Sequence, residues 1–154
     1  MISNTSPIIF LAKINSLDLL KNLYGHVIVT GDVKEELLGK NKPDTEKIRI
    51  AFEKEILTVN NPHALLGLGL GKEENSSISL ATESKDILLL DDLQATRAAT
   101  ALGIRTLRTT TVLFSALKRK FITKKDALAM INQIIDEGYY IAPRYYKDII
   151  DRLK

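Results

Sequence analysis

The chain has 154 residues, of which 45% are hydrophobic and 27% are charged. A chain of this length can bury roughly two-thirds of its unfolded surface, so we expect a single domain over residues 1–154. The absence of cysteine excludes disulfides, thiolate metal sites and a cysteine nucleophile. The net charge of +3 permits an anionic partner such as RNA but does not require one.

The sequence begins without a basic leader or a small-residue cleavage site. No apolar run approaches the ~18 residues that would cross a bilayer. We therefore expect a cytoplasmic protein with no membrane association.

Short apolar runs alternate with amphipathic stretches of helical period, a pattern typical of βα units around a parallel sheet. Strands are predicted over residues 1–3, 26–29, 56–59, 86–90 and 104–107. Residues 87–90 are all apolar, as in a strand buried on both faces, and we expect this run in the middle of the sheet. The predicted fold class is an α/β/α sandwich with a mainly parallel sheet of about five strands.

Several helix starts are marked by side chains that can cap a helix, namely Ser6, Thr30, Asp92 and Thr109. Two later helices are predicted, from residue 123 or 124 to 136 and from about 143 to 153. Residues 60–71 are expected to form an irregular loop whose flexibility affects access to the site.

The glycines of that loop do not indicate a nucleotide site. A phosphate-binding loop needs Ser or Thr after Gly-Lys and a strand before it, whereas Gly71-Lys72 is followed by Glu73 and no strand adjoins. A turn into a helix is the favoured interpretation.

Oxygen-bearing side chains stand at several predicted strand ends and helix starts, where α/β sheets bind their ligands. They are Asn4, Glu36, Glu74 and the pair Asp91 and Asp92. Carboxylate and amide oxygens without neighbouring His or Cys suit Mg²⁺ or Mn²⁺, which most often serve phosphate chemistry. A metal-dependent nuclease is the leading hypothesis.

Each of these residues also has a purely structural interpretation. Asn4 suits a helix entry, Glu36 stands at a helix edge that can be solvated, and Glu74 lies in a first helical turn, where negative charge is favoured. Helix geometry places Glu36 beside the buried face and Glu35 on the far side, towards water. Because one acid is enough to cap the next helix, we assign Asp92 to the cap and Asp91 to the site.

Four segments, taken together, resemble a PIN domain, and more narrowly its VapC-like branch. They are Ile-Ser-Asn-Thr-Ser-Pro-Ile-Ile at 2–9, Val-Lys-Glu-Glu-Leu at 33–37, Leu-Leu-Leu-Asp-Asp at 88–92, and Asp-Glu-Gly-Tyr-Tyr-Ile at 136–141 with a Tyr pair at 145–146. The resemblance covers nearly the whole chain. It implies an endoribonuclease, a hydrolase that uses Mg²⁺ or Mn²⁺, and a place in a toxin–antitoxin system with a cognate antitoxin; we also expect a homodimer.

The same resemblance implies roles for individual residues. Asn4, Glu36, Glu74 and Asp91 correspond to the catalytic, metal-binding positions of the family, and Asp92 is an additional metal ligand. Acids at these positions hold the ions that activate water and stabilise the leaving oxygen, so no histidine base is required. Neither His26 nor His63 is therefore given a role.

The chain departs from the family pattern at three places. Asn4 stands where many PIN domains have aspartate, Ser76 replaces an acid, and residues 108–111 read Arg-Thr-Thr-Thr where more glycine is expected. We expect the loss of charge at Asn4 to weaken activity. The alternative hypothesis is a catalytically weakened PIN-fold module that binds nucleic acid or protein, while a DNA-binding regulator lacks support because no helix-turn-helix pattern is present.

Cations that could meet RNA phosphates are Arg97, Arg108 and Lys118, of which Arg97 follows the Asp pair most closely. A lysine near a helix end is also favoured by the helix dipole alone. Four tyrosines, at positions 139, 140, 145 and 146, could stack on bases, but packing of the last helix or a dimer contact is favoured.

Overall fold

The computed structural model describes residues 1–154 as five strands and nine helices. The strands are β1 (Ile2–Ser3), β2 (Val27–Val29), β3 (Leu57–Val59), β4 (Leu88–Leu89) and β5 (Thr106–Leu107). The helices are α1 (Thr5–Lys13), α2 (Asp18–Tyr24), α3 (Gly31–Leu38), α4 (Pro43–Glu53), α5 (Lys72–Ser84), α6 (Leu93–Ala101), α7 (Thr109–Lys118), α8 (Lys124–Asp136) and α9 (Pro143–Leu153).

All strands of the sheet are parallel, in the order β3-β2-β1-β4-β5. The chain builds β1, β2 and β3 towards one edge and then crosses to β4 and β5 on the other side of β1. The strand order therefore reverses between β1 and β4, and ligands of such sheets bind outside the carboxyl ends of the strands at this switch point.

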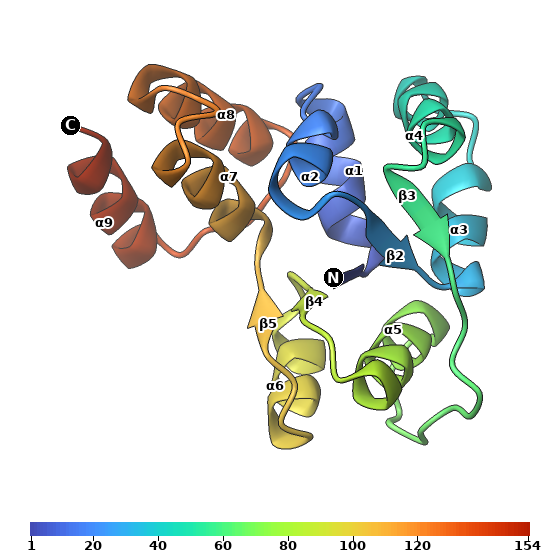
Figure 1. Ribbon diagram of the computed structural model, residues 1–154. Coiled ribbons are helices and arrows are strands. Elements are labelled where there is room, and N and C mark those ends of the chain that lie inside the picture. The colour runs from blue at the N-terminus through green and yellow to red at the C-terminus, as the bar shows by residue number, and fades with distance from the viewer.

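Helices cover both faces of the sheet (Figure 1), which confirms the predicted α/β/α architecture. The larger apolar cluster holds 24 buried residues and draws on α1 to α4, α7 and α8. A second cluster of nine buried residues joins the other face of the sheet to α5 and α6.

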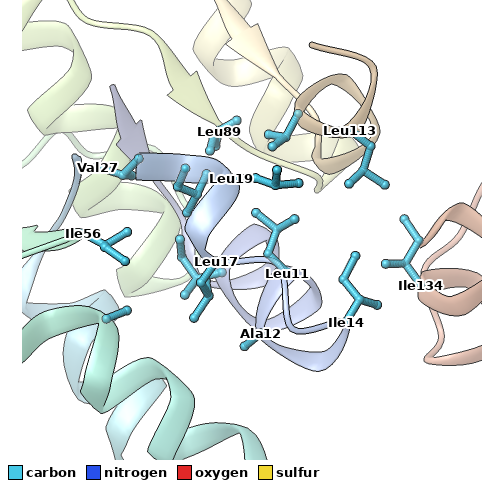
Figure 2. Close-up of a cluster of buried hydrophobic side chains, with 14 of the residues drawn as sticks. Leu11, Ala12, Ile14, Leu17, Leu19, Val27, Ile56, Leu89, Leu113 and Ile134 are labelled. Atoms are coloured by element: carbon cyan, nitrogen blue, oxygen red, sulfur yellow. The ribbon is translucent and has the colours of Figure 1, made fainter. Parts of the chain in front are cut away.

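Strand β4 shows how its apolar run serves both clusters. Leu89 packs in the larger cluster (Figure 2), whereas Leu88 and Leu90 pack in the smaller one. All three side chains are fully buried, and each contributes about 1.5–3 kcal/mol relative to an exposed position. The strand is interior as predicted, although β1 and not β4 takes the central place.

Two predicted helix caps differ from the structure by one or two residues. The N-cap of α1 is Asn4, not Ser6, because the first three helical positions need no intrahelical N–H partner and so accept Pro7 at the third. The N-cap of α7 is Arg108, not Thr109, whose hydroxyl is committed elsewhere. Caps at Thr30 and Asp92 are confirmed by bonds from the backbone N–H of Val33 and Ala95, and Thr123 caps α8.

Residues 60–71 are irregular, as predicted, but α5 holds this loop in place. The Glu83 carboxylate accepts bonds of 3.0 Å from the backbone N–H groups of His63 and Ala64. The Ser79 hydroxyl accepts another, of 3.0 Å, from Leu66. These bonds tie the loop along the helix that carries Glu74.

None of the helices combines the length and apolar character needed to cross a membrane.

Candidate active site at the carboxyl edge of the sheet

Asn4 lies at the switch point, directly after β1. Its side chain is buried, with 3% of its surface exposed, and it makes no capping bond to α1. Instead the Asn4 Nδ2 group donates to Glu74 Oε1 at 3.3 Å, and Asn4 Oδ1 accepts from the Ser77 hydroxyl at 3.4 Å. The amide therefore joins β1 to the first turn of α5.

Glu74 reaches Asn4 because its side chain folds back over the start of α5. The N-cap of this helix is Gly71, and a Cβ atom there would lie 2.6 Å from Glu74 Oε2. Glycine at this position leaves the space that the carboxylate occupies. The negative charge also lies in the first helical turn, where the helix dipole favours it.

Glu36 enters the same region from α3. Its Oε2 atom accepts a 2.7 Å bond from the hydroxyl of Thr5, the residue after Asn4. The neighbouring Glu35 points elsewhere, towards Lys72, with its carboxylate 3.7 Å from the lysine nitrogen. Helix geometry predicts that Glu36 and Glu35 point in different directions, and in the structure they have different partners.

Asp91 follows β4 and accepts three hydrogen bonds from the protein. Its Oδ1 atom accepts from the Thr109 backbone N–H at 3.0 Å and from the Tyr139 hydroxyl at 2.8 Å, while Oδ2 accepts from the Thr109 hydroxyl at 2.6 Å. Its side chain is 10% exposed, and Arg108 Nε lies 4.0 Å away. Asp92 caps α6 through a 2.7 Å bond from the Ala95 N–H, as predicted.

Tyr139 reaches Asp91 because α8 ends in a Schellman turn. Gly138 has φ +99°, the Gly138 N–H donates to the Ile135 carbonyl, and the Tyr139 N–H donates to the Ile134 carbonyl. The chain then turns Tyr139 into the larger apolar cluster, edge-on to Phe10 with ring centroids 5.0 Å apart.

The electrostatic environment keeps Tyr139 a hydrogen-bond donor. Burial, and next the negative charge of Asp91, raise the pKa of Tyr139 above its usual value. The Arg108 guanidinium lies 5.4 Å from the centre of the Tyr139 ring and opposes this rise only in part. The hydroxyl is therefore protonated at neutral pH and can hold Asp91 in one orientation.

The structure thus divides the predicted acids into three sets of bonds, Asn4 with Glu74, Glu36 with Thr5, and Asp91 with Thr109 and Tyr139. No three Asp, Glu or His side chains form a group that could hold a metal ion in this arrangement. The donor set still fits Mg²⁺ or Mn²⁺ in kind, because every candidate ligand atom is an oxygen.

The predicted cations lie at different distances from these acids. Arg108 is at the site, beside Asp91, and its guanidinium also donates to the Tyr140 carbonyl at 3.4 Å. Arg97 is exposed in the second turn of α6. Lys118 is exposed in the last turn of α7, about 13 Å along the helix from Thr109.

Sequence reasoning missed the residues that orient the acids: Thr5, Ser77, Thr109 and Tyr139. Thr109 had a usable signal, since it begins the helix that follows β5 and so lies at the carboxyl edge. Tyr139 was expected only to pack, and it does pack, but its hydroxyl also binds Asp91 across 48 positions of sequence.

The parallel sheet and the oxygen-bearing side chains at its switch point define an α/β domain with a candidate ligand site at the carboxyl edge of the sheet. A family model described as "DUF3368: PIN domain" matches residues 1–154, so the chain belongs to this family of PIN domains. The fold is similar to that of a PilT N-terminus domain protein from the hyperthermophilic archaeon Sulfolobus solfataricus P2. That match has a TM-score of 0.56 and 19% identity, and covers 76% of this chain and 94% of the other. A search of curated proteins gave no match.

Proposed function

We propose that this PIN domain is a metal-dependent ribonuclease of the VapC type, which hydrolyses phosphodiester bonds of RNA. The observation that carries the proposal is the Asn4–Glu74 contact at the switch point, with Glu36 joined to it through Thr5 and Asp91 following the neighbouring strand. PIN domains are in general nucleases, and the sequence resemblance implies that these four residues stand at the acidic positions of the family.

Asn4, Glu36, Glu74 and Asp91 would hold Mg²⁺ or Mn²⁺, with Asp92 as an additional ligand. Bound ions of this kind supply an activated water and stabilise the leaving oxygen. Asn4 would hold an ion through Oδ1, because the amide nitrogen that now faces the Glu74 carboxylate cannot ligate a cation.

The residues of the chain position the acids and the substrate. Thr109 and Tyr139 fix Asp91, and Thr5 fixes Glu36. Arg108 lies beside Asp91, where it can contact a phosphate, and Arg97 extends the positive charge along α6. Lys118 would contact only RNA that continues along α7.

Isothermal titration calorimetry with Mn²⁺, together with a cleavage assay on single-stranded RNA, tests the proposal. Glu36→Gln and Glu74→Gln should weaken metal binding and cleavage together. Glu35→Gln and Glu73→Gln are matched controls, since each changes the adjacent glutamate, and both should behave like wild type. Mn²⁺ binding that is equal in all four variants would refute this assignment.

A specific observation favours a second candidate, a PIN-fold module that binds nucleic acid or protein without cleavage. The Asn4 amide satisfies Glu74 without a cation, and Ser76, at a position where the family has an acid, lies 2.8 Å from the Thr30 hydroxyl instead of meeting Asn4. This candidate predicts no heat of Mn²⁺ binding in wild type.

The biological setting follows from the same proposal. A VapC-type ribonuclease would act in the cytoplasm, form a homodimer and be blocked by a cognate antitoxin. Sequencing the neighbouring gene tests for the antitoxin, and light scattering of the purified protein tests for the dimer. A monomer that cleaves RNA would remove the dimer from the proposal and leave the chemistry unchanged.

A further inference from the structure

The structure separates the four clustered tyrosines into two pairs. The Tyr139 hydroxyl donates to Asp91 at 2.8 Å, and the Tyr146 hydroxyl donates to Asn132 Oδ1 at 3.0 Å. Both side chains pack in or against the larger cluster. Tyr140 and Tyr145 are 75% and 59% exposed, and no hydrogen bond engages their hydroxyls. Packing accounts for the first pair only.

Both exposed tyrosines line the same cleft. It has a volume of about 510 Å³ and also includes Asp91, Leu93 and Arg108 in its lining. The wall formed by the α8–α9 link and the start of α9 carries the tyrosines, the wall formed by the first turn of α6 carries Leu93, and Asp91 and Tyr139 also line the cleft. The cleft thus includes Asp91, one of the candidate catalytic residues.

The chemistry of this lining fits an unpaired nucleotide. Leu93 is 65% exposed, so the two walls of the cleft present apolar and aromatic surfaces that remain in water. Exposed tyrosines can stack on any base through the π-face while their hydroxyls stay hydrated. Arg108 is fixed by the Tyr140 carbonyl and by the Tyr139 ring, and its charge can meet a phosphate.

We propose that this cleft binds one unpaired nucleotide of single-stranded RNA, with its base stacked on Tyr140 or Tyr145 and the adjoining phosphate at Arg108. The proposal deepens the proposed function by naming a substrate site beside Asp91, and rests on it for the identity of the substrate. RNA is favoured over a protein segment because the aromatic walls stand next to a fixed arginine and a candidate catalytic acid.

Fluorescence anisotropy of labelled oligouridylate, measured in EDTA, tests the site without cleavage. Tyr140→Ala and Tyr145→Ala should each weaken binding, with a loss on the order of tenfold for the tyrosine that stacks. Tyr140→Phe and Tyr145→Phe should retain near wild-type affinity, because phenylalanine keeps the π-face. Phe121→Ala is the control, an exposed aromatic beyond the far end of α7, and should bind like wild type.

Two outcomes would overturn the proposal. Affinities of both alanine variants equal to that of Phe121→Ala would do so and would indicate a protein-docking surface instead. Phenylalanine variants as weak as the alanine variants would show that the π-face is not the contact. If RNA binds as expected in EDTA but is not cleaved with Mn²⁺, the stacking site stands and only the proposed hydrolysis fails.

Discussion

On the β4–β5 side of the site, Asp91 accepts three hydrogen bonds of 2.6 to 3.0 Å, whereas on the β1–α5 side Glu74 accepts one of 3.3 Å from Asn4. The first carboxylate is almost buried and is surrounded by donors of α7 and the α8–α9 link. The second is half-buried and leans over Gly71. The protein fixes Asp91 in advance and leaves Glu74 free to change partners, so the β1–α5 side is where metal binding would rearrange the site.

The largest expected effect comes from Asp91→Ala. Removing the carboxylate leaves the Thr109 N–H, the Thr109 hydroxyl and the Tyr139 hydroxyl without their acceptor. Unpaired donors in a nearly buried position should lower the free energy of unfolding by about 3 kcal/mol, measured by urea denaturation. Glu74→Ala should cost less than about 1 kcal/mol in the same assay; equal losses would remove the difference between the two sides.

Tyr139→Phe sharpens the same comparison, because it keeps the ring against Phe10 and removes only the hydroxyl. We expect a loss of about 1 kcal/mol near neutral pH. A tyrosine in the unfolded chain ionises near pH 10, while the folded-state pKa of Tyr139 is raised, so wild-type stability should fall as pH rises above about 10.

The variant lacks this titration, so its deficit relative to wild type should shrink between about pH 9 and 11 in urea denaturation. Tyr24→Phe should show a change of the same sign, since burial also raises the pKa of Tyr24. A deficit that stays constant over this range would mean that Tyr139 titrates as it does in the unfolded chain.

Asn4→Asp should affect the β1–α5 side of the site. It replaces the amide that donates to Glu74 with a carboxylate facing Glu74, and without metal this repulsion should cost roughly 1–2 kcal/mol. Mn²⁺ should raise the melting temperature of Asn4→Asp more than that of wild type. Asn4→Asp should also cleave RNA faster than wild type when Mn²⁺ is present. The double variant with Glu74→Gln should lose most of this gain, and equal Mn²⁺ responses would place Asn4 outside any metal site.

The smallest expected effect concerns Arg108. If its guanidinium contacts one phosphate, Arg108→Gln should reduce the slope of log affinity against log salt by about one unit for a short single-stranded RNA. Lys118→Gln should leave the slope unchanged, because Lys118 lies at the far end of α7. Reversed results would move the RNA path from the carboxyl edge of the sheet to the outer end of α7.

The fold was predictable because its signals are local. The apolar run that includes Leu88–Leu89 indicated a strand buried on both faces, and side chains such as Thr30 and Asp92 marked helix starts that the structure confirms. The carboxyl ends of parallel strands lie at one edge of the sheet, so the general location of Asn4 and Asp91 could also be predicted.

The bonding of the site was not predictable, since it depends on residues far apart in the sequence. Nothing near Asp91 indicates that Tyr139 will be its donor, and nothing near Asn4 indicates that its amide nitrogen will face Glu74, 70 positions later. Helix geometry could separate Glu36 from Glu35, because both lie on one helix, but it could not identify Thr5 as the partner of Glu36.

The position of the Schellman turn at Gly138 affects when the site around Asp91 can form during synthesis of the chain. All five strands are complete once residue 107 has been added, yet Tyr139 comes 32 residues later, after α7 and α8. A nascent chain can therefore assemble the sheet while Asp91 still lacks one of its three donors. The finished geometry at Asp91 arises only when the turn after α8 has formed, so a chain stalled before residue 139 would carry the acids without their final arrangement.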